Sequence, residues 1–125
     1  MFVDKIFSAC YPVCGVILLQ IEVDGLIVEW DDNKAEINKQ KHNVHFEDAA
    51  QIFLDGNRVT EIDYSHSDEE IRYVTIGRVG KILFVVYTER GEAMRLISAR
   101  KADKNERRKY FYGQNFYLPR NGLDG

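Results

Sequence analysis

RYVTIGRVGKILFVVYTERGEAMRLISARKA, residues 72–102, contains three strand-forming segments separated by short turns. Residues 70–78 alternate between the two faces of a strand, and residues 81–88 are almost continuously apolar. Residues 93–99 are the last strand, with Arg95, Ile97 and Ala99 expected on one side and Met94, Leu96 and Ser98 on the other. Gly80 marks the first turn, and we expect a hairpin loop over residues 89–92. Such short connections join antiparallel neighbours, so this stretch predicts the centre of an antiparallel sheet.

Further elements are predicted on both sides of this stretch. Residues 59–63 are a short strand candidate, and residues 26–30 are another. A helix is expected to open at Asp31-Asp32-Asn33 and to run to about Lys41, with Asn43 at the C-cap and a mostly polar face through Lys34, Asn38 and His42. Further helices are expected from about Phe46 to Leu54 and from about Asp103, the expected N-cap, to Tyr112. The order predicts an α+β fold in which helices cover one face of the sheet. The residues assigned to the core are Trp30, Phe46, Phe53, Phe84 and Leu96.

The length and composition indicate one globular domain. The chain has 125 residues, of which 45% are hydrophobic and 30% charged. We expect a domain over residues 26–112, an N-terminal extension of uncertain structure over residues 1–25, and a C-terminal tail over residues 113–125. The extension has an apolar run that weakly resembles a secretory signal, but an added strand, a loosely packed arm, or sequence upstream of the true start are equally open. The rest of the sequence is typical of a cytoplasmic protein.

The charge is divided unevenly along the chain. The net charge is -3, but residues 1–80 carry 7 basic and 15 acidic residues, whereas residues 81–125 carry 10 basic and 5 acidic ones. A polyanion would therefore be attracted to the C-terminal part. The alternative is an ordinary solvated basic helix.

Several kinds of catalytic site are disfavoured by the motifs. The pair His42 and His45 has no carboxylate cluster at ligand spacing, so we expect no metal and no cofactor. Cys10 and Cys14 are too few for a structural zinc site and are expected to be reduced thiols. The sequence contains no nucleophile elbow and no phosphate-binding loop with a lysine.

The arginines of the predicted sheet are the remaining candidates. Arg72, Arg78, Arg95 and Arg100 lie on neighbouring strands or at their ends, and guanidinium groups that converge suit a phosphate. In RNA the 2′-hydroxyl can attack the adjacent phosphorus, so cations and modest acid–base help suffice. Glu89 or His42 would transfer the proton. Alternatively, the arginines form surface ion pairs with the acidic residues Glu61, Glu69, Glu70 and Glu92.

Two blocks of sequence carry a resemblance to a known family. These are the EWDDNK, KH and FEDAA segments within residues 29–50, and the TER, RLISARKA and ERRKY segments within residues 88–110. The stretch from Leu26 to Tyr112 resembles the BrnT family of ribonuclease toxins. Three departures are Asn43 in place of a usual glycine, His45 in place of a small hydroxyl residue that would cap the second helix, and the extension before Leu26.

The resemblance implies a RelE-like fold, an antiparallel sheet with two N-terminal helices packed on it and a C-terminal helix. It also implies metal-independent RNA cleavage in a type II toxin–antitoxin system, and neutralisation by a ribbon-helix-helix antitoxin of the BrnA type, through which alone DNA would be contacted. Residue by residue, it favours Arg78, Arg95, Arg100, Glu89 and His42 as catalytic, and Lys34, Arg72, Arg90 and Lys101 as RNA contacts. The competing hypothesis is a non-catalytic or degenerate module that acts only in a repressor complex with its partner.

Overall fold

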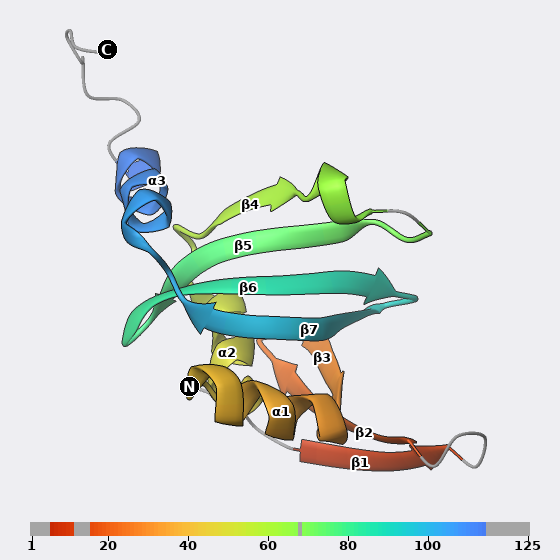
Figure 1. Ribbon diagram of the computed structural model, residues 1–125. Coiled ribbons are helices and arrows are strands. Elements are labelled where there is room, and N and C mark those ends of the chain that lie inside the picture. Colours follow the sequence, from red (N-terminus) through yellow and green to blue (C-terminus); the bar gives the residue numbers. More distant parts are fainter. Residues whose placement is uncertain (1–5, 12–15, 68, 115–125) are drawn as a thin grey trace, which may run out of the picture.

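A seven-stranded sheet with helices on both faces forms within residues 6–11, 16–67 and 69–114, the part of the chain that this computed structural model describes (Figure 1). The strands are β1 (Ile6–Tyr11), β2 (Val16–Val23), β3 (Leu26–Asp31), β4 (Val59–Ile62), β5 (Arg72–Val79), β6 (Lys81–Arg90) and β7 (Ala93–Lys101). The helices are α1 (Asp32–His42), α2 (Phe46–Ala49), α3 (Lys104–Gln114) and the 3-10 segments η1 (Ala50–Leu54) and η2 (Tyr64–His66). The predicted α+β class is confirmed.

The sheet is mixed, whereas the sequence predicted an antiparallel one. Its strand order is β1-β2-β3-β7-β6-β5-β4, and β4 to β7 form the expected antiparallel meander. The exception is β3, which pairs with β7 in parallel. Parallel neighbours need a long crossover, and here the crossover consists of α1, α2, η1 and the whole β4–β6 meander.

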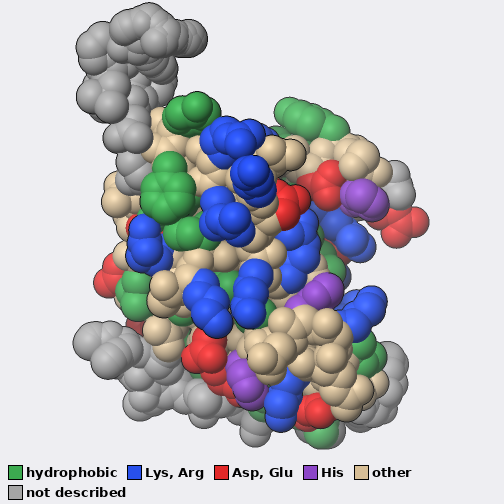
Figure 2. All heavy atoms as spheres, turned by 60° about the vertical axis from the view of Figure 1, so that its left-hand side comes forward, with side chains coloured by type: hydrophobic (Ala, Val, Ile, Leu, Met, Phe, Trp, Pro, Cys, Tyr) green, Lys and Arg blue, Asp and Glu red, His purple; other side chains and the backbone are tan. Residues whose placement is uncertain are grey.

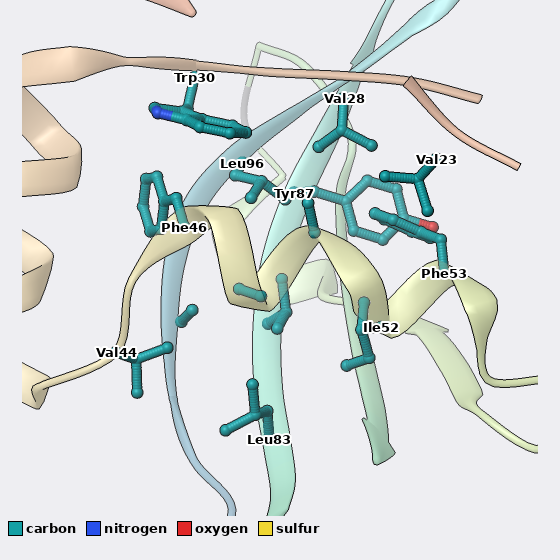
Figure 3. Packing of buried hydrophobic residues seen from close by; sticks show 14 of the residues in the cluster. Val23, Val28, Trp30, Val44, Phe46, Ile52, Phe53, Leu83, Tyr87 and Leu96 are labelled. Atoms are coloured by element: carbon teal, nitrogen blue, oxygen red, sulfur yellow. The ribbon is translucent and has the colours of Figure 1, made fainter. Parts of the chain in front are cut away.

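The main core lies between α2–η1 and one face of the sheet (Figure 3). Trp30 and Phe46 are fully buried and meet edge to face, with ring centroids 6.0 Å apart. Phe53 packs on Tyr87 in the same way at 5.2 Å. Leu96 is buried beside them, so the predicted core assignments hold for Trp30, Phe46, Phe53 and Leu96.

The opposite face of the sheet is covered at one end by α3, which corrects the expectation that the helices lie on one face. Buried Tyr110 of α3 packs with Ile76, Ile82 and Ala102. Phe84, predicted to be core, lies half-buried against this second cluster. Because β6 places apolar side chains on both faces, one layer of helices cannot remove all of them from water.

The ends of the helices follow the sequence signals. The Asp31 side chain accepts a hydrogen bond from the Asn33 backbone N–H and caps α1, and Asn43 ends the helix in the left-handed conformation (φ 58°, ψ 37°). His45 precedes α2 without any side-chain capping bond, as expected from the missing hydroxyl. The predicted helix over residues 46–54 is one short α-helical segment followed by the tighter η1.

The N-terminal extension adds two strands to the sheet. β2 pairs with β1 on one side and with β3 on the other, both antiparallel. Ile21 and Val23 of β2 are fully buried in the main core. Of the possibilities left open by the sequence, residues 16–23 therefore form an added strand that shares the domain's core. Residues 1–5, 12–15 and 115–125 lie outside the described residues, and with them Cys14 and most of the predicted tail. No described helix combines the length and hydrophobicity needed to cross a bilayer.

Candidate functional site

The strand register places the four predicted arginines on one face of the sheet, here called the arginine face. Arg72 pairs with Thr88, which pairs in turn with Arg95. Arg78 pairs with Ile82 and Arg100 with Phe84, both of which belong to the face covered by α3. Since cross-strand partners point to the same side of a sheet, all four guanidinium-bearing side chains leave the sheet on the side opposite α2.

A β-bulge is responsible for this arrangement in β7. Simple alternation would put Arg95 beside Ala99 and opposite Arg100, as the sequence predicted. The register shifts between Val86 and Tyr87, so that Ile97 has no partner and Arg95 and Arg100 share a face. Ala99 is instead fully buried in the main core. The prediction for Arg95 with Ala99 was wrong, and the error came from the extra residue.

Arg95 is held by a buried carboxylate. Its Nε and Nη2 atoms each lie 2.6 Å from Oε2 of Glu29, its neighbour across the parallel β3–β7 pair. The Glu29 side chain is only 7% exposed, and Gln20 of β2 donates a hydrogen bond to its Oε1 at 3.2 Å. Removal of either partner would leave a charge without compensation in a largely dry position.

Arg100 is held by α3. Its Nη1 and Nη2 atoms donate to the two carboxylate oxygens of Glu106, each at 2.8 Å, and its guanidinium lies 4.0 Å from the centroid of the Phe84 ring. The hydrogen bonds to Glu106 raise the pKa of Arg100. Glu106 also accepts a bond from the Asp103 N–H while Asp103 caps the Glu106 N–H, a reciprocal capping box. The predicted N-cap role of Asp103 is therefore confirmed.

Arg90 is paired as well, at the far end of β6. It forms a bidentate pair with Glu70, with its Nε at 2.9 Å and its Nη2 at 3.0 Å from the carboxylate oxygens. This contact lowers the pKa of Glu70 and raises that of Arg90. Both side chains are well exposed, so the pair contributes little to stability. Of the predicted alternative partners, Glu70 is thus confirmed, and Glu61 instead pairs with Lys109 at 3.0 Å.

Arg72 and Arg78 form no salt bridge with any described residue. Arg78 is exposed and its guanidinium lies 5.9 Å from the ring centroids of both Tyr110 and Phe111. Its backbone N–H donates to Asp55 Oδ2 at 2.8 Å, and the Tyr110 hydroxyl donates to the same oxygen at 2.7 Å. Arg78 is thus the sheet arginine most open to a ligand.

Asp55 and Tyr110 shift each other's pKa. Partial burial acts to raise the pKa of Asp55, but the hydrogen bonds from Arg78, Tyr110 and Asn57 outweigh it, and the pKa lies below its ordinary value. Burial, followed by the bond to Asp55, raises the pKa of Tyr110. Asp55 and Arg78 line a hollow of about 280 Å³ together with Gln51, Leu54, Val79 and Gly80.

Glu89, His42, Lys34 and Lys101 do not join the arginine face. Glu89 was expected in a hairpin loop, but β6 continues to Arg90, and the register with Met94 turns Glu89 to the core side of the sheet. Lys101 pairs with Leu83 and also faces that side. Lys34 and His42 lie in the first and last turns of α1, on the edge of β7.

The partners Glu29, Glu106, Asp55 and Tyr110 were missed by the sequence analysis. Glu29 and Glu106 stand within the two blocks that carry the resemblance, yet only their spatial neighbours reveal what they hold. Within the described residues, no group of three or more histidine, cysteine or acidic side chains is placed to hold a metal ion.

Lys and Arg side chains gather over the end of the molecule that carries α3, the β5–β6 turn and the last residues of β7 (Figure 2). Few acidic side chains interrupt them in this view. The uneven charge predicted from the sequence therefore becomes a positive surface beside the arginine face.

The fold and this surface define a small α+β domain with a guanidinium-lined sheet face, suited to a phosphate-bearing ligand. Residues 30–106, more than half of the chain, match the family described as the ribonuclease toxin, BrnT, of type II toxin–antitoxin systems. The chain belongs to this BrnT family, as the resemblance implied.

A solved structure is also similar to the chain. It is the 1.1 Å crystal structure of the ribonuclease toxin BrnT from Brucella abortus, which has 26% sequence identity and a TM-score of 0.47, over 60% of this chain and 94% of that one. Among curated protein sequences, none matches this chain significantly.

Proposed function

We propose that this protein is a metal-independent endoribonuclease that binds the RNA backbone on its arginine face. The observation that carries the proposal is that Arg72, Arg78, Arg95 and Arg100 leave the sheet on the same side, Arg78 and Arg100 near the β5–β6 turn and Arg72 and Arg95 toward the other end of β6. Family membership supports the wider statement, a ribonuclease toxin with a cognate antitoxin. An antitoxin of the BrnA ribbon-helix-helix type, and contact with DNA only through it, are part of the proposal.

In the proposed reaction the RNA supplies its own nucleophile. The 2′-hydroxyl oxygen attacks the adjacent phosphorus, the bond from phosphorus to the 5′-oxygen breaks, and the products end in a 2′,3′-cyclic phosphate and a 5′-hydroxyl. Arg78 and Arg100, whose β6 partners Ile82 and Phe84 lie near the β5–β6 turn, stabilise the extra negative charge on the phosphorane. Arg95, whose partner Thr88 lies toward the other end of β6, would contact the RNA backbone further along the strand. Arg72 and Arg90 would contact flanking phosphates, whereas Lys34 and Lys101, also predicted as RNA contacts, do not share the arginine face and are not placed on the bound strand.

The ion pairs of Arg95 and Arg100 set a condition on this proposal. Each arginine must exchange a carboxylate for a phosphate when RNA binds, whereas Arg78 meets RNA without such an exchange. When Arg95 turns to a backbone phosphate, the Glu29 carboxylate loses its cation. Glu89 and His42 are not placed in the reaction, because they do not share the arginine face.

The paired arginines also favour the second candidate, a non-catalytic module that binds its partner. In that case the three ion pairs only stabilise the fold. Arg90 of β6 binds Glu70, which precedes β5, while Arg95 and Arg100 of β7 bind Glu29 of β3 and Glu106 of α3.

Incubation of the purified full chain with single-stranded RNA in the presence of a chelator separates the two candidates. The nuclease proposal expects cleavage that is insensitive to the chelator and products with 2′,3′-cyclic phosphate ends. Intact RNA together with tight binding of the antitoxin would favour the non-catalytic module. Cleavage that stops when the chelator is added would contradict metal independence.

A further inference from the structure

The outer side of α3 carries exposed aromatic and basic side chains. Lys104, Arg108 and Tyr112 follow one another at i, i+4 and i+8 and therefore form one line along the helix, and Arg107 and Phe111 form the next line. All five side chains are exposed. We call these five residues the α3 stripe.

The inner side of α3 accounts for the helix's attachment to the sheet. Tyr110 is buried, Glu106 holds Arg100, and Lys109 pairs with Glu61 of β4. The stripe meets this inner set at Phe111, whose ring packs edge to face on the Tyr110 ring with centroids 5.3 Å apart. Among the described residues, its cations donate to neutral oxygens, Arg107 to the Ala102 carbonyl and Arg108 to Asn105 on the same helix.

The two aromatic rings of the stripe remain largely in water. Tyr112 is 66% exposed and Phe111 is 43% exposed. A single exposed apolar residue is common on protein surfaces and needs no explanation. Here two adjacent rings lie on a strongly basic helix, because residues 104–112 include four basic side chains and one acidic one. Green side chains lie among blue ones on the helix in Figure 2. Single-stranded nucleic acids are bound by this combination, cations along the backbone and rings on which the bases stack.

We propose that the α3 stripe binds single-stranded RNA next to the arginine face, with Tyr112 and Phe111 stacking on bases and Lys104, Arg107 and Arg108 contacting phosphates. The inference rests on the proposed function for its substrate and adds the surface that holds the strand. Arg78 connects the two surfaces, because its guanidinium lies 5.9 Å from the Phe111 ring centroid while its strand belongs to the arginine face. An acidic protein segment would pair with the cations but would leave the rings unused.

The test measures the affinity of the full-length chain for a short single-stranded 2′-O-methyl oligoribonucleotide, which lacks the attacking hydroxyl and is not cleaved. Fluorescence anisotropy is recorded for the wild type, Tyr112→Ala, Tyr112→Trp, Phe111→Ala/Tyr112→Ala and Arg108→Ala. The matched control is Tyr64→Ala, which removes a tyrosine that is 82% exposed in η2, away from α3. Circular dichroism confirms that each variant retains its helices.

Tyr112→Ala should weaken binding about fivefold or more, the double variant should weaken it further, and Tyr112→Trp should retain it. Tyr64→Ala should stay within about twofold of the wild type. Arg108→Ala should weaken binding, and the slope of log affinity against log salt concentration should fall by the amount expected for about one phosphate contact. Polyglutamate, a polyanion without bases, should bind Tyr112→Ala as well as it binds the wild type.

The proposal is overturned if Tyr112→Ala and the double variant bind the oligonucleotide like the wild type. It is also overturned if Tyr112→Ala weakens polyglutamate and the oligonucleotide equally, because stacking then plays no part. Cleavage of ordinary RNA by the wild type is measured in parallel. If the wild type cleaves RNA but binding does not depend on Tyr112, the α3 stripe proposal is wrong and the nuclease proposal stands. If binding depends on Tyr112 but no RNA is cleaved, the α3 stripe is supported and the nuclease proposal is contradicted.

Discussion

At the scale of single residues, Asn38 shows how a polar side chain joins a helix to the sheet. It lies on the line of α1 that the sequence predicted to be a mostly polar face, yet it is 4% exposed. Its Nδ2 donates to the carbonyls of Val44 and Ala99, and its Oδ1 accepts from the Ala99 N–H. β3 pairs with β7 only as far as Arg95, so Asn38 satisfies backbone groups of β7 that no strand reaches.

Asn38→Ala should therefore lower the free energy of unfolding by roughly 2–4 kcal/mol, because it leaves buried backbone groups without partners. Gln40→Ala, at an exposed position of the same helix, should change it by less than about 0.5 kcal/mol. Urea titration measures both. Equal midpoints for the two variants would show that the Asn38 bonds contribute nothing.

Gly77 is required for the close approach of η1 to β5. A Cβ atom at this position would lie 2.6 Å from Cγ1 of Ile52, which is fully buried. Gly77→Ala should destabilise the protein by about 1–3 kcal/mol. Gly56→Ala is the matched control, since nothing lies within 4 Å of its Cβ position. Thermal unfolding that ranks the two variants in the opposite order would contradict this packing.

At the scale of elements, β5 and β6 were predictable and β7 was not. The faces of β5 follow from its alternation, and the burial of β6 on both faces follows from its apolar run. In β7 the unpaired Ile97 reverses the alternation, and Arg95 and Arg100 come together only for that reason. No turn residue or glycine marks the bulge in the sequence, so its position depends on pairing with β6.

The hydrogen bond from Tyr110 to Asp55 anchors α3. It should make the free energy of unfolding depend on pH in both the acidic and the alkaline range. Asp55 has a lowered pKa, so its contribution is present above its ordinary value of 3.8 and is lost as the pH falls below it. Tyr110 has a raised pKa, so its contribution is present below its ordinary value of 10.0 and is lost as the pH rises beyond it.

Tyr110→Phe should lower stability near neutral pH by about 1 kcal/mol, because the Asp55 oxygen keeps access to water, and should flatten both limbs of the profile. Tyr112→Phe, an exposed tyrosine on the same helix, should leave the profile unchanged. The unfolding midpoint of each variant is measured between about pH 3 and 11, a range that includes the ordinary pKa values of aspartate and tyrosine. Identical profiles for wild type and Tyr110→Phe would remove the anchoring role.

At the scale of the whole molecule, the N-terminal strands enlarge the sheet beyond the residues that match the family. β2 contributes fully buried side chains to the main core, although the family match begins at residue 30. Ile21→Ala should cost roughly 2–5 kcal/mol, whereas Ile17→Ala on the same strand, where the side chain is 44% exposed, should cost much less. Equal losses in a denaturant titration would mean that β2 does not depend on the core.

Long-range pairings explain what the sequence could not predict about the whole fold and its site. The parallel β3–β7 contact joins Glu29 to Arg95 across 66 positions, and Tyr110 reaches Asp55 across 55. Local periodicity carries no information about such partners. The sequence predicted these arginines as the site, but its alternation for β7 put Arg95 and Arg100 on opposite faces, and it did not identify Glu29 and Glu106 as the carboxylates that hold them.

The central claim, that the arginine face holds the reacting phosphate, is tested most directly by the single-turnover rate of RNA cleavage in chelator for Arg78→Ala. Arg78 is the informative position because its exposed side chain forms no salt bridge with a described residue. Arg95→Ala is less informative, because it leaves the buried Glu29 carboxylate without its cation unless Glu29→Gln is introduced as well. Lys39→Ala, an exposed cation on α1, is the control. We predict a rate at least about 100-fold below wild type for Arg78→Ala and an unchanged rate for Lys39→Ala; equal rates for wild type and Arg78→Ala would contradict the claim.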